Sequence, residues 1–167
     1  MFLSETEFTN IVKSTPLVAI DLCIFKGRKI LLGKRINSPA KDFFFVPGGR
    51  ILKSELKKDA FSRILVQELG MVLRDGHHKL IKNLGLYEHF YEDNFLGNRE
   101  FSTHYLVIAY LIQYDSLTEI KITNRYNQHS EFIWFPIDNI GKSNPPFIHE
   151  YTKAYLNNSL IQELTNV

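Results

Sequence analysis

The residues best suited to chemistry follow a pair of glycines, Gly48 and Gly49. Glycine lets the backbone come close to a ligand, and the residues after this pair have the pattern of a helix. On that helix Ile64, Gln67 and Glu68 are three and four positions apart, so they share one edge. Glu68 is the only carboxylate of the three, and a carboxylate beside a glycine-rich turn is typical of sites for hard divalent cations. An ordinary amphipathic helix has the same pattern, so both interpretations stay open on spacing alone.

Asp21 is a second candidate for chemistry. It interrupts the otherwise apolar run Leu17–Phe25. An isolated buried charge is costly, so this carboxylate must be exposed at an edge or paired with another group. The position is therefore a site candidate on its chemistry alone.

The surrounding pattern predicts an α/β fold in which helices cover a sheet. Apolar, β-branched and aromatic runs predict strands at Val18–Phe25, Lys29–Leu32, Phe43–Val46, Leu84–Tyr91, Tyr105–Gln113 and Glu131–Pro136. Helices are predicted at Phe2–Ser14, Ser54–Leu69 and Phe147–Leu164. We expect Ser54 to cap the second helix and Gly70 to end it. A hairpin is expected at Lys26–Arg28, and a turn at Gly48–Gly49.

Length and composition predict one domain spanning residues 1–167, because single domains commonly contain about 100–200 residues. The 20 Lys and Arg nearly balance the 18 Asp and Glu, leaving a formal charge of +2. We therefore expect no nucleic-acid partner, since such proteins carry a strongly basic face. The apolar fraction of 44% supplies a core and excludes a wholly disordered chain.

The single cysteine, Cys23, excludes an internal disulfide framework and a cysteine-rich zinc site. One unpaired thiol fits a reducing compartment, so a cytoplasmic location is expected. No signal peptide is apparent, because Glu5 and Glu7 stand where a basic region would be needed. The uncharged stretch Phe101–Tyr114 is shorter than the ~20 residues of a membrane span, so no membrane partner is expected.

One spacing is specific enough to indicate a family. Gly49, five residues, Glu55, seven residues and Arg63, followed by Glu68 and Gly70, resembles the Nudix box. That motif reads Gly, five residues, Glu, seven residues, Arg-Glu, an aliphatic residue, any residue, Glu-Glu, any residue, Gly and an aliphatic residue. The resemblance implies the Nudix fold, a mixed β-sheet sandwiched between α-helices.

The motif departs from the family at two positions. Ile64 and Gln67 stand where the family has glutamates that complete a metal-binding edge with the position of Glu68. With two of three carboxylates replaced by neutral groups, we expect one divalent cation rather than several. The departures fit either a Nudix domain that binds without catalysis or a subfamily that works with a reduced metal site.

Flanking segments favour the second interpretation. They resemble the GDP-mannose mannosyl hydrolases, a Nudix subfamily that also lacks the two glutamates, at Thr15–Val18, Leu31–Arg35, Phe45–Arg50, Glu68–Gly70, His89–Phe95 and Thr103–Tyr105. The resemblance implies hydrolysis of GDP-mannose, or of other GDP-hexoses, to GDP and free sugar. Water attacks the anomeric carbon with inversion in that subfamily. One Mg²⁺ for each active site, replaceable by Mn²⁺, and a homodimer are also implied.

The resemblance carries roles to particular residues. It implies metal ligands at Gly49, Glu68 and Gln128, and a general base at His129. Histidine suits that task because its unperturbed pKa lies near neutrality. The alternative for His129 is a solvated histidine in the polar loop Asn124–Ser130.

The remaining implied roles concern the substrate. Guanidinium groups grip phosphate oxygens in a bidentate way, and a phenol can donate to the leaving phosphate. The alternative for the phenol is an aromatic residue of the core. These roles fall on Arg35, Arg50 and Arg63 for the diphosphate, on Tyr105 for the leaving phosphate, and on Asp21 and His89 for the region of the sugar and leaving group. Glu55 is expected to be structural, through a pair with Arg63.

Overall fold

The computed structural model describes residues 3–70, 78–114, 128–140 and 147–165. Its strands are β1 (Leu17–Lys26), β2 (Lys29–Arg35), β3 (Phe44–Phe45), β4 (Gly48–Arg50), β5 (His78–Tyr91), β6 (Thr103–Tyr114) and β7 (His129–Pro136). The α-helices are α1 (Glu5–Ser14), α2 (Lys57–Leu69), α3 (Glu150–Leu156) and α4 (Ser159–Thr165), and a short 3₁₀ turn covers Ile137–Asn139. Among the described residues, no helix combines the length and the apolarity that crossing a bilayer requires.

The strands form one mixed sheet in the order β3-β2-β1-β6-β5, with β4 paired to β1 and β7 paired to β2. The central strands β1 and β6 run parallel, in register from Leu17 opposite Tyr105 to Phe25 opposite Gln113. The other strand pairs of the described sheet are antiparallel. The long parallel pair brings residues of the first and the middle third of the chain side by side.

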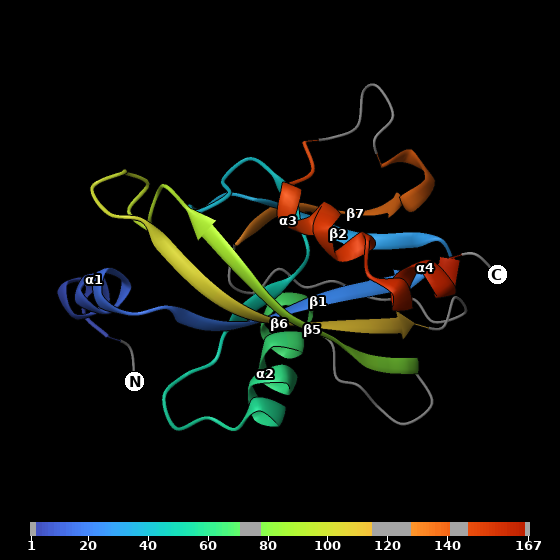
Figure 1. The fold of residues 1–167 in the computed structure, drawn as a ribbon, viewed down its shortest axis with the longest axis horizontal. Helices are drawn as coiled ribbons and strands as arrows, with labels where there is room; N and C mark the ends of the chain where they lie inside the picture. Colours follow the sequence, from blue (N-terminus) through green and yellow to red (C-terminus); the bar gives the residue numbers. More distant parts are fainter. Residues whose placement is uncertain (1–2, 71–77, 115–127, 141–146, 166–167) are drawn as a thin grey trace.

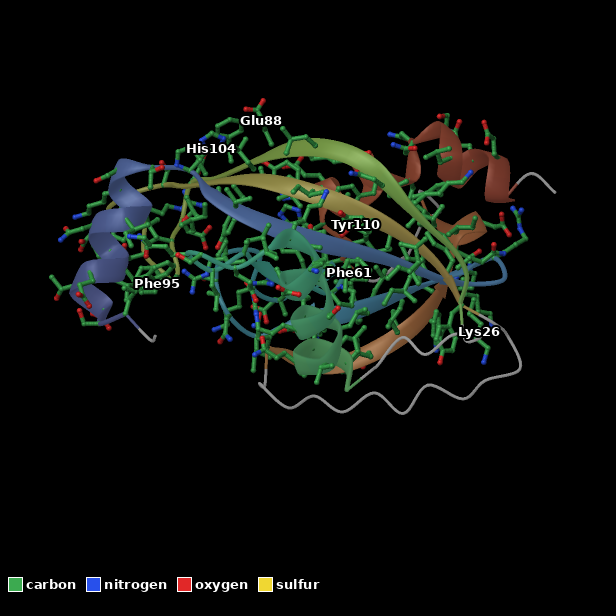
Figure 2. The ribbon with its side chains drawn as sticks, turned by 90° about the horizontal axis from the view of Figure 1, so that it is seen from below. Lys26, Phe61, Glu88, Phe95, His104 and Tyr110 are labelled. Carbon is green, nitrogen blue, oxygen red and sulfur yellow. The ribbon has the colours of Figure 1, made fainter. Side chains whose placement is uncertain are left out.

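Helices cover both faces of the sheet (Figure 1), which confirms the predicted fold class. On one face α2 packs against apolar side chains of the central strands, and Phe61 of α2 meets Tyr110 of β6 with ring centroids 4.9 Å apart (Figure 2). On the other face α3 and α4 pack with Tyr155 and Ile161 against a second core cluster. The α1 helix lies at one end of the sheet, and Ser4 closes a capping box with Glu7 at its start.

The start of α2 differs from the prediction. Ser54 is not the N-cap: the helix begins at Lys57 and Leu56 occupies the cap position without a side-chain hydrogen bond. A turn in which the Glu55 amide donates to the Leu52 carbonyl puts Ser54 at φ 65°. The predicted end is confirmed, because Gly70 adopts the left-handed conformation at φ 66° that favours glycine.

The predicted C-terminal helix is wrong as a single element. It is broken between α3 and α4 at Asn157 and Asn158. The side-chain N–H groups of Asn158 donate to the Leu84 carbonyl and to the Tyr87 hydroxyl of β5. The side-chain oxygen of Asn158 accepts from the backbone N–H of Leu160 at the start of α4. These contacts with a distant strand end one helix and begin the next.

The glycine pair lies in a strand rather than in a turn. Gly48 and Gly49 belong to β4, opposite Asp21 and Ile20 of β1. A side chain at Gly48 would collide with the Asp21 carboxylate, and a Cβ at Gly49 would lie 3.1 Å from Ile64 of α2. Close packing of β4 between β1 and α2, not a turn, therefore explains the two glycines.

Candidate active site

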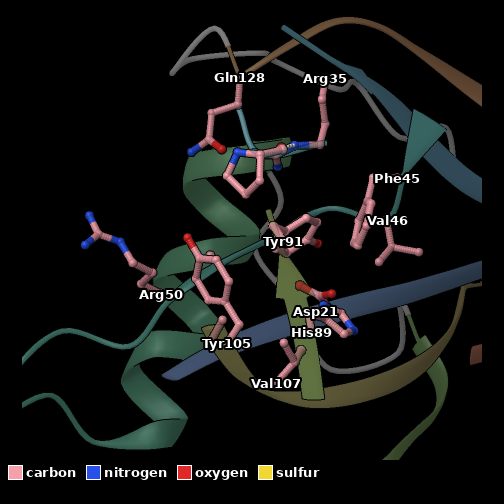
Figure 3. A pocket seen from close by; sticks show the side chains of 14 residues that line it. Asp21, Arg35, Phe45, Val46, Arg50, His89, Tyr91, Tyr105, Val107 and Gln128 are labelled. Atoms are coloured by element: carbon pink, nitrogen blue, oxygen red, sulfur yellow. Dashed lines mark hydrogen bonds between the residues drawn. The ribbon is translucent and has the colours of Figure 1, made fainter. Parts of the chain in front are cut away.

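A pocket opens on the sheet where β1, β2, β4, β5 and β6 bring polar side chains together (Figure 3). Most of the predicted site residues line it: Asp21, Arg35, Gly49, Arg50, His89, Tyr105 and Gln128. Glu68 bonds with Gln128 and lies next to His129, and Arg63 donates to the Arg50 carbonyl of β4. Most neighbouring positions of this set lie 13 or more residues apart in the sequence, so only the fold assembles them.

Glu68, Gln128 and His129 form one cluster, although they come from α2 and from the start of β7. The Gln128 amide donates to Glu68 Oε1 at 3.0 Å, and His129 Nδ1 lies 3.7 Å from Glu68 Oε2. Glu68 is only 5% exposed. Burial raises the pKa of its carboxyl to about 7, and the positive charges of Arg35 and Arg63 oppose that rise.

His129 is the first residue of β7 and lies opposite Arg35 of β2, so it is not a solvated loop histidine. Its ring is buried against Gly33 and Phe132. A Cβ at Gly33 would lie 2.5 Å from the His129 ring, so glycine leaves the room that the ring needs. Burial, with help from Arg35, lowers the pKa of His129 to about 4, and the ring is neutral at pH 7.

The two neutral positions of the motif have structural partners. Ile64 is buried in the core under Gly49. Gln67 accepts a hydrogen bond of 2.8 Å from Arg63. In the described part of the chain, no group of three or more His, Cys, Asp and Glu side chains is placed to hold a metal ion. The edge of α2 therefore offers one carboxylate, as the sequence predicts.

Arg63 ties α2 to the loop before it. Its guanidinium donates to both Glu55 oxygens, at 2.6 and 2.8 Å, and also to the Arg50 carbonyl at 2.7 Å. The expected Glu55–Arg63 pair is confirmed. The hydrogen bond from Arg63 lowers the pKa of the Glu55 carboxyl. With its donors directed at protein oxygens, Arg63 holds the backbone that positions the Arg50 side chain.

We expect Glu55→Gln to destabilise the protein at pH 7 by about 1–3 kcal/mol, because a charge-assisted bidentate pair is lost. The folded-state pKa of Glu55 is lowered, so its stabilisation is present above the unfolded-state value and disappears as the pH falls through the folded-state value. Denaturant unfolding at pH 7 and at pH 3 should therefore show a smaller difference between variant and parent at pH 3 than at pH 7.

Glu92→Gln is the matched control for that variant. Glu92 pairs with Arg99 at 3.2 Å, but both side chains are exposed. Exposed ion pairs contribute about 0–1 kcal/mol, so this variant should unfold almost as the parent does. An equal loss in the two variants at pH 7 would contradict the structural role given to Glu55.

Two arginines supply positive charge to the pocket. Arg35 donates from Nε to the Pro39 carbonyl at 2.9 Å. Arg50 lies over the ring of Phe8 in α1, with its guanidinium carbon 4.0 Å from the ring centroid, and burial lowers its pKa. Tyr105 lines the pocket beside them, and burial raises its pKa, so its phenol keeps the proton that it can donate.

Asp21 and His89 lie at the floor of the pocket, and both are buried. Burial raises the pKa of Asp21 to about 7, and burial lowers the pKa of His89 to about 4. Tyr155 of α3 joins them: its hydroxyl donates to Asp21 Oδ2 at 2.6 Å and lies 3.0 Å from His89 Nε2. Sequence reasoning missed Tyr155, and the only signal for it was that Asp21 required a partner.

The segment that contains these residues matches the model of the NUDIX domain over residues 15–156. The match covers most of the chain and includes every element that lines the pocket. The chain belongs to the Nudix family. It is therefore a Nudix hydrolase by family, and hydrolases of this family generally use divalent metal ions.

Several known proteins resemble this one in sequence or in fold. The low-salt glycan biosynthesis protein Agl8 of Haloferax volcanii is 31% identical over 156 residues, covering 92% of this chain and 88% of its own. An ADP-ribose pyrophosphatase of Methanocaldococcus jannaschii is 42% identical over 57 residues, 34% of each chain. A MutT NUDIX hydrolase from Burkholderia pseudomallei superposes with a TM-score of 0.66 and 23% identity over 87% of this chain and 98% of that one.

Proposed function

We propose that this Nudix protein hydrolyses GDP-mannose, or a closely related GDP-hexose, to GDP and free sugar. In the proposed reaction, water attacks the anomeric carbon with inversion. The bond between that carbon and the phosphate oxygen breaks, and its electron pair leaves with GDP. The proton of the attacking water goes to His129.

One observation carries the proposal: Glu68, Gln128 and His129 are in contact, although 59 residues separate the first two in sequence. A single carboxylate, a carboxamide and a neutral imidazole are the set that the reduced metal site and the general base require. The relative from Haloferax volcanii is named for glycan biosynthesis, which supports a substrate that contains a sugar.

The residues around Glu68 fit one divalent cation. Its carboxylate, the carboxamide oxygen of Gln128 and the backbone carbonyl of Gly49 are hard oxygen ligands, which Mg²⁺ and Mn²⁺ prefer. In the present structure a Gln128 N–H donates to Glu68 Oε1, so this carboxylate oxygen already faces an electropositive group. When bound, such a cation supplies Lewis-acid stabilisation of the departing diphosphate.

The remaining side chains have separate tasks in the proposed reaction. His129 is neutral and holds a nitrogen lone pair that can accept the proton of water. Arg35 and Arg50 offset the negative charge that builds on the diphosphate, and Tyr105 donates to it. Arg63 acts through the backbone that it holds at Arg50. Asp21 and His89 face the sugar and its leaving oxygen.

A pyrophosphatase reaction is the second candidate, since a pyrophosphatase is among the relatives. Attack at phosphorus would give GMP and a hexose 1-phosphate from the same substrate. The reduced metal edge disfavours it, because Ile64 and Gln67 supply no carboxylate to collect further cations. A Nudix domain that binds nucleotide sugars without catalysis is the third candidate.

Hydrolysis in ¹⁸O-labelled water separates these three functions. We expect the label in the sugar hydroxyl, because the anomeric carbon accepts the oxygen of water. Label in a phosphate group would identify the pyrophosphatase and overturn the proposal. Binding of GDP-mannose with no turnover in the presence of Mg²⁺ would identify the binding domain. Mass spectrometry of the products shows which one carries the label, and GDP-glucose and GDP-fucose are tested in parallel.

A homodimer and a cytoplasmic location stay predictions. The mass of the protein in solution, measured by light scattering, tests the dimer, and fractionation of the cells that produce it tests the location.

A further inference from the structure

The C-terminal helix α3 supplies the floor of the pocket through one hydroxyl group. Tyr155 is fully buried, and its hydroxyl touches two pocket residues at once. It donates to Asp21 Oδ2 at 2.6 Å and lies 3.0 Å from His89 Nε2. Asp21 comes from β1 and His89 from β5, so this hydroxyl joins three separate elements.

Contacts at both ends of α3 hold this hydroxyl in place. Near its start, the Tyr151 hydroxyl accepts from the Phe90 amide and donates to the Phe90 carbonyl, each at 2.8 Å. After its end, the Asn158 amide donates to the Leu84 carbonyl and the Tyr87 hydroxyl. All of these partners lie on β5, the strand that carries His89.

The ring of His89 is held as well. It stacks on the ring of Tyr151, with centroids 4.0 Å apart and an angle of 3° between the planes. Stacking fixes the plane of the imidazole, while the contact with Tyr155 fixes its rotation within that plane. The ring therefore has one orientation relative to the pocket.

The hydrogen-bond inventory determines where the protons lie. An ionised carboxylate only accepts, so the Tyr155 hydroxyl gives its one hydrogen to Asp21. The short contact with His89 then requires a hydrogen from Nε2. In a neutral imidazole, protonation at Nε2 leaves Nδ1 as an acceptor.

We propose that Tyr155 is a positioning residue of this site. Its hydroxyl orients the Asp21 carboxylate and fixes His89 as the tautomer protonated at Nε2. The floor of the pocket then offers only hydrogen-bond acceptors from these two residues, a set that suits the donating hydroxyl groups of a sugar. The kinetic part of this inference rests on the proposed function, whereas the structural part does not.

The structural part is tested without substrate, by ¹⁵N NMR of the imidazoles at pH 8.5, where Asp21 is ionised. We expect the His89 ring to be protonated at Nε2 and this proton to exchange slowly with water. Its signal is assigned by its absence from the spectrum of His89→Gln. In Tyr155→Phe, exchange should be about tenfold faster or more, because the acceptor is gone. An unchanged rate would overturn the proposal. If that variant does not fold, the parent decides alone, since a His89 ring protonated at Nδ1 also overturns it.

Tyr87→Phe is the matched control for that experiment. Tyr87 packs against the Tyr155 ring, with centroids 4.7 Å apart, and its hydroxyl bonds with Asn158 rather than with Asp21 or His89. The variant also removes one hydroxyl beside α3, but the Asn158 side chain keeps its hydrogen bond to the Leu84 carbonyl. The end of α3 should therefore stay in place, and the His89 signal should persist. If both variants lose the signal equally, the effect is general loosening of α3, and the proposal is wrong.

The kinetic part is tested with GDP-mannose. Tyr155→Phe should lower kcat by about tenfold or more and change KM less, while Tyr87→Phe stays within about twofold. In an Asp21→Asn background, Tyr155→Phe should cost clearly less than in the parent, because the part of its effect that acts through Asp21 is already lost. Fully multiplicative losses would overturn positioning through Asp21. If the parent protein does not turn over GDP-mannose, the proposed function fails, and the NMR result still decides the role of Tyr155.

Discussion

Replacing His129 with glutamine is expected to lower the turnover of GDP-mannose by about 10²–10⁴-fold, the usual contribution of a general base. Glutamine cannot accept the proton of water at neutral pH, but it is polar and smaller than the ring that packs against Gly33 and Phe132. The proposed ligands Glu68 and Gln128 are left in place, so Mg²⁺ affinity should change little. Steady-state kinetics, with calorimetric titration of Mg²⁺, measure both quantities.

His104→Gln provides the matched control. His104 stacks on Phe90 with ring centroids 4.3 Å apart and does not line the pocket. Its replacement also removes one imidazole, yet turnover should stay close to that of the parent. Unaltered activity of His129→Gln across the pH range would refute the assignment of the base.

The second large effect is expected for Glu68→Gln. This carboxylate is the charged member of the proposed metal site, so the variant should lose most of its Mg²⁺-dependent turnover. The Gln128 amide can still donate to the new carboxamide oxygen, and the cluster should stay folded. A Mg²⁺ titration of the rate is the measurement, and a normal Mg²⁺ dependence would refute the role of Glu68 as a ligand.

The same variant should be more stable than the parent when no cation is present. Burial raises the pKa of Glu68 to about 7, so the folded protein binds this proton more tightly than the unfolded chain does. The parent therefore loses stability as the pH rises from about 4.5 to about 7, and the glutamine variant does not. Above pH 7 the difference is on the order of 3 kcal/mol.

Thermal unfolding at pH 4 and pH 8.5, with a chelator or with Mg²⁺, tests this reversal. With the chelator at pH 8.5 the variant should melt at a higher temperature than the parent. Mg²⁺ should stabilise the parent and leave the variant unchanged, because only the parent binds it well. A variant that melts below the parent at pH 8.5 without Mg²⁺ would contradict the burial cost assigned to Glu68.

Local signals in the sequence predicted the elements that depend on neighbouring residues. Gly70 ends α2 in the left-handed conformation, and the hairpin after Lys26 joins β1 to β2 as expected. The start of α2 was not predictable in this way. Ser54 is displaced from the cap position because Glu55 turns to reach Arg63, a partner eight positions later on the helix.

Distant contacts explain the other differences. Asn158 breaks the C-terminal helix because it bonds with Leu84 and Tyr87, more than 70 residues earlier. His129 begins a strand because it pairs beside Arg35, not because of its polar neighbours. Most residues of the candidate site were predicted from the family resemblance. A family pattern relates residues that are far apart in the sequence, whereas local spacing does not. Neither the resemblance nor the local pattern predicted Tyr155, because nothing in either distinguishes one tyrosine of a C-terminal helix.

The contact between Arg50 and Phe8 has a consequence for how such a protein can diversify. Phe8 lies in α1, before the first residue of the matched domain at position 15. The flat guanidinium can stack on the ring and still present the donors at its edge to a phosphate. If Arg50 binds the diphosphate as proposed, a substitution at position 8 would change the strength of that binding without altering any residue of the matched domain. Substrate affinity would then depend on a helix that lies outside the residues matched to the family, and Phe8→Leu tests this through the KM for GDP-mannose.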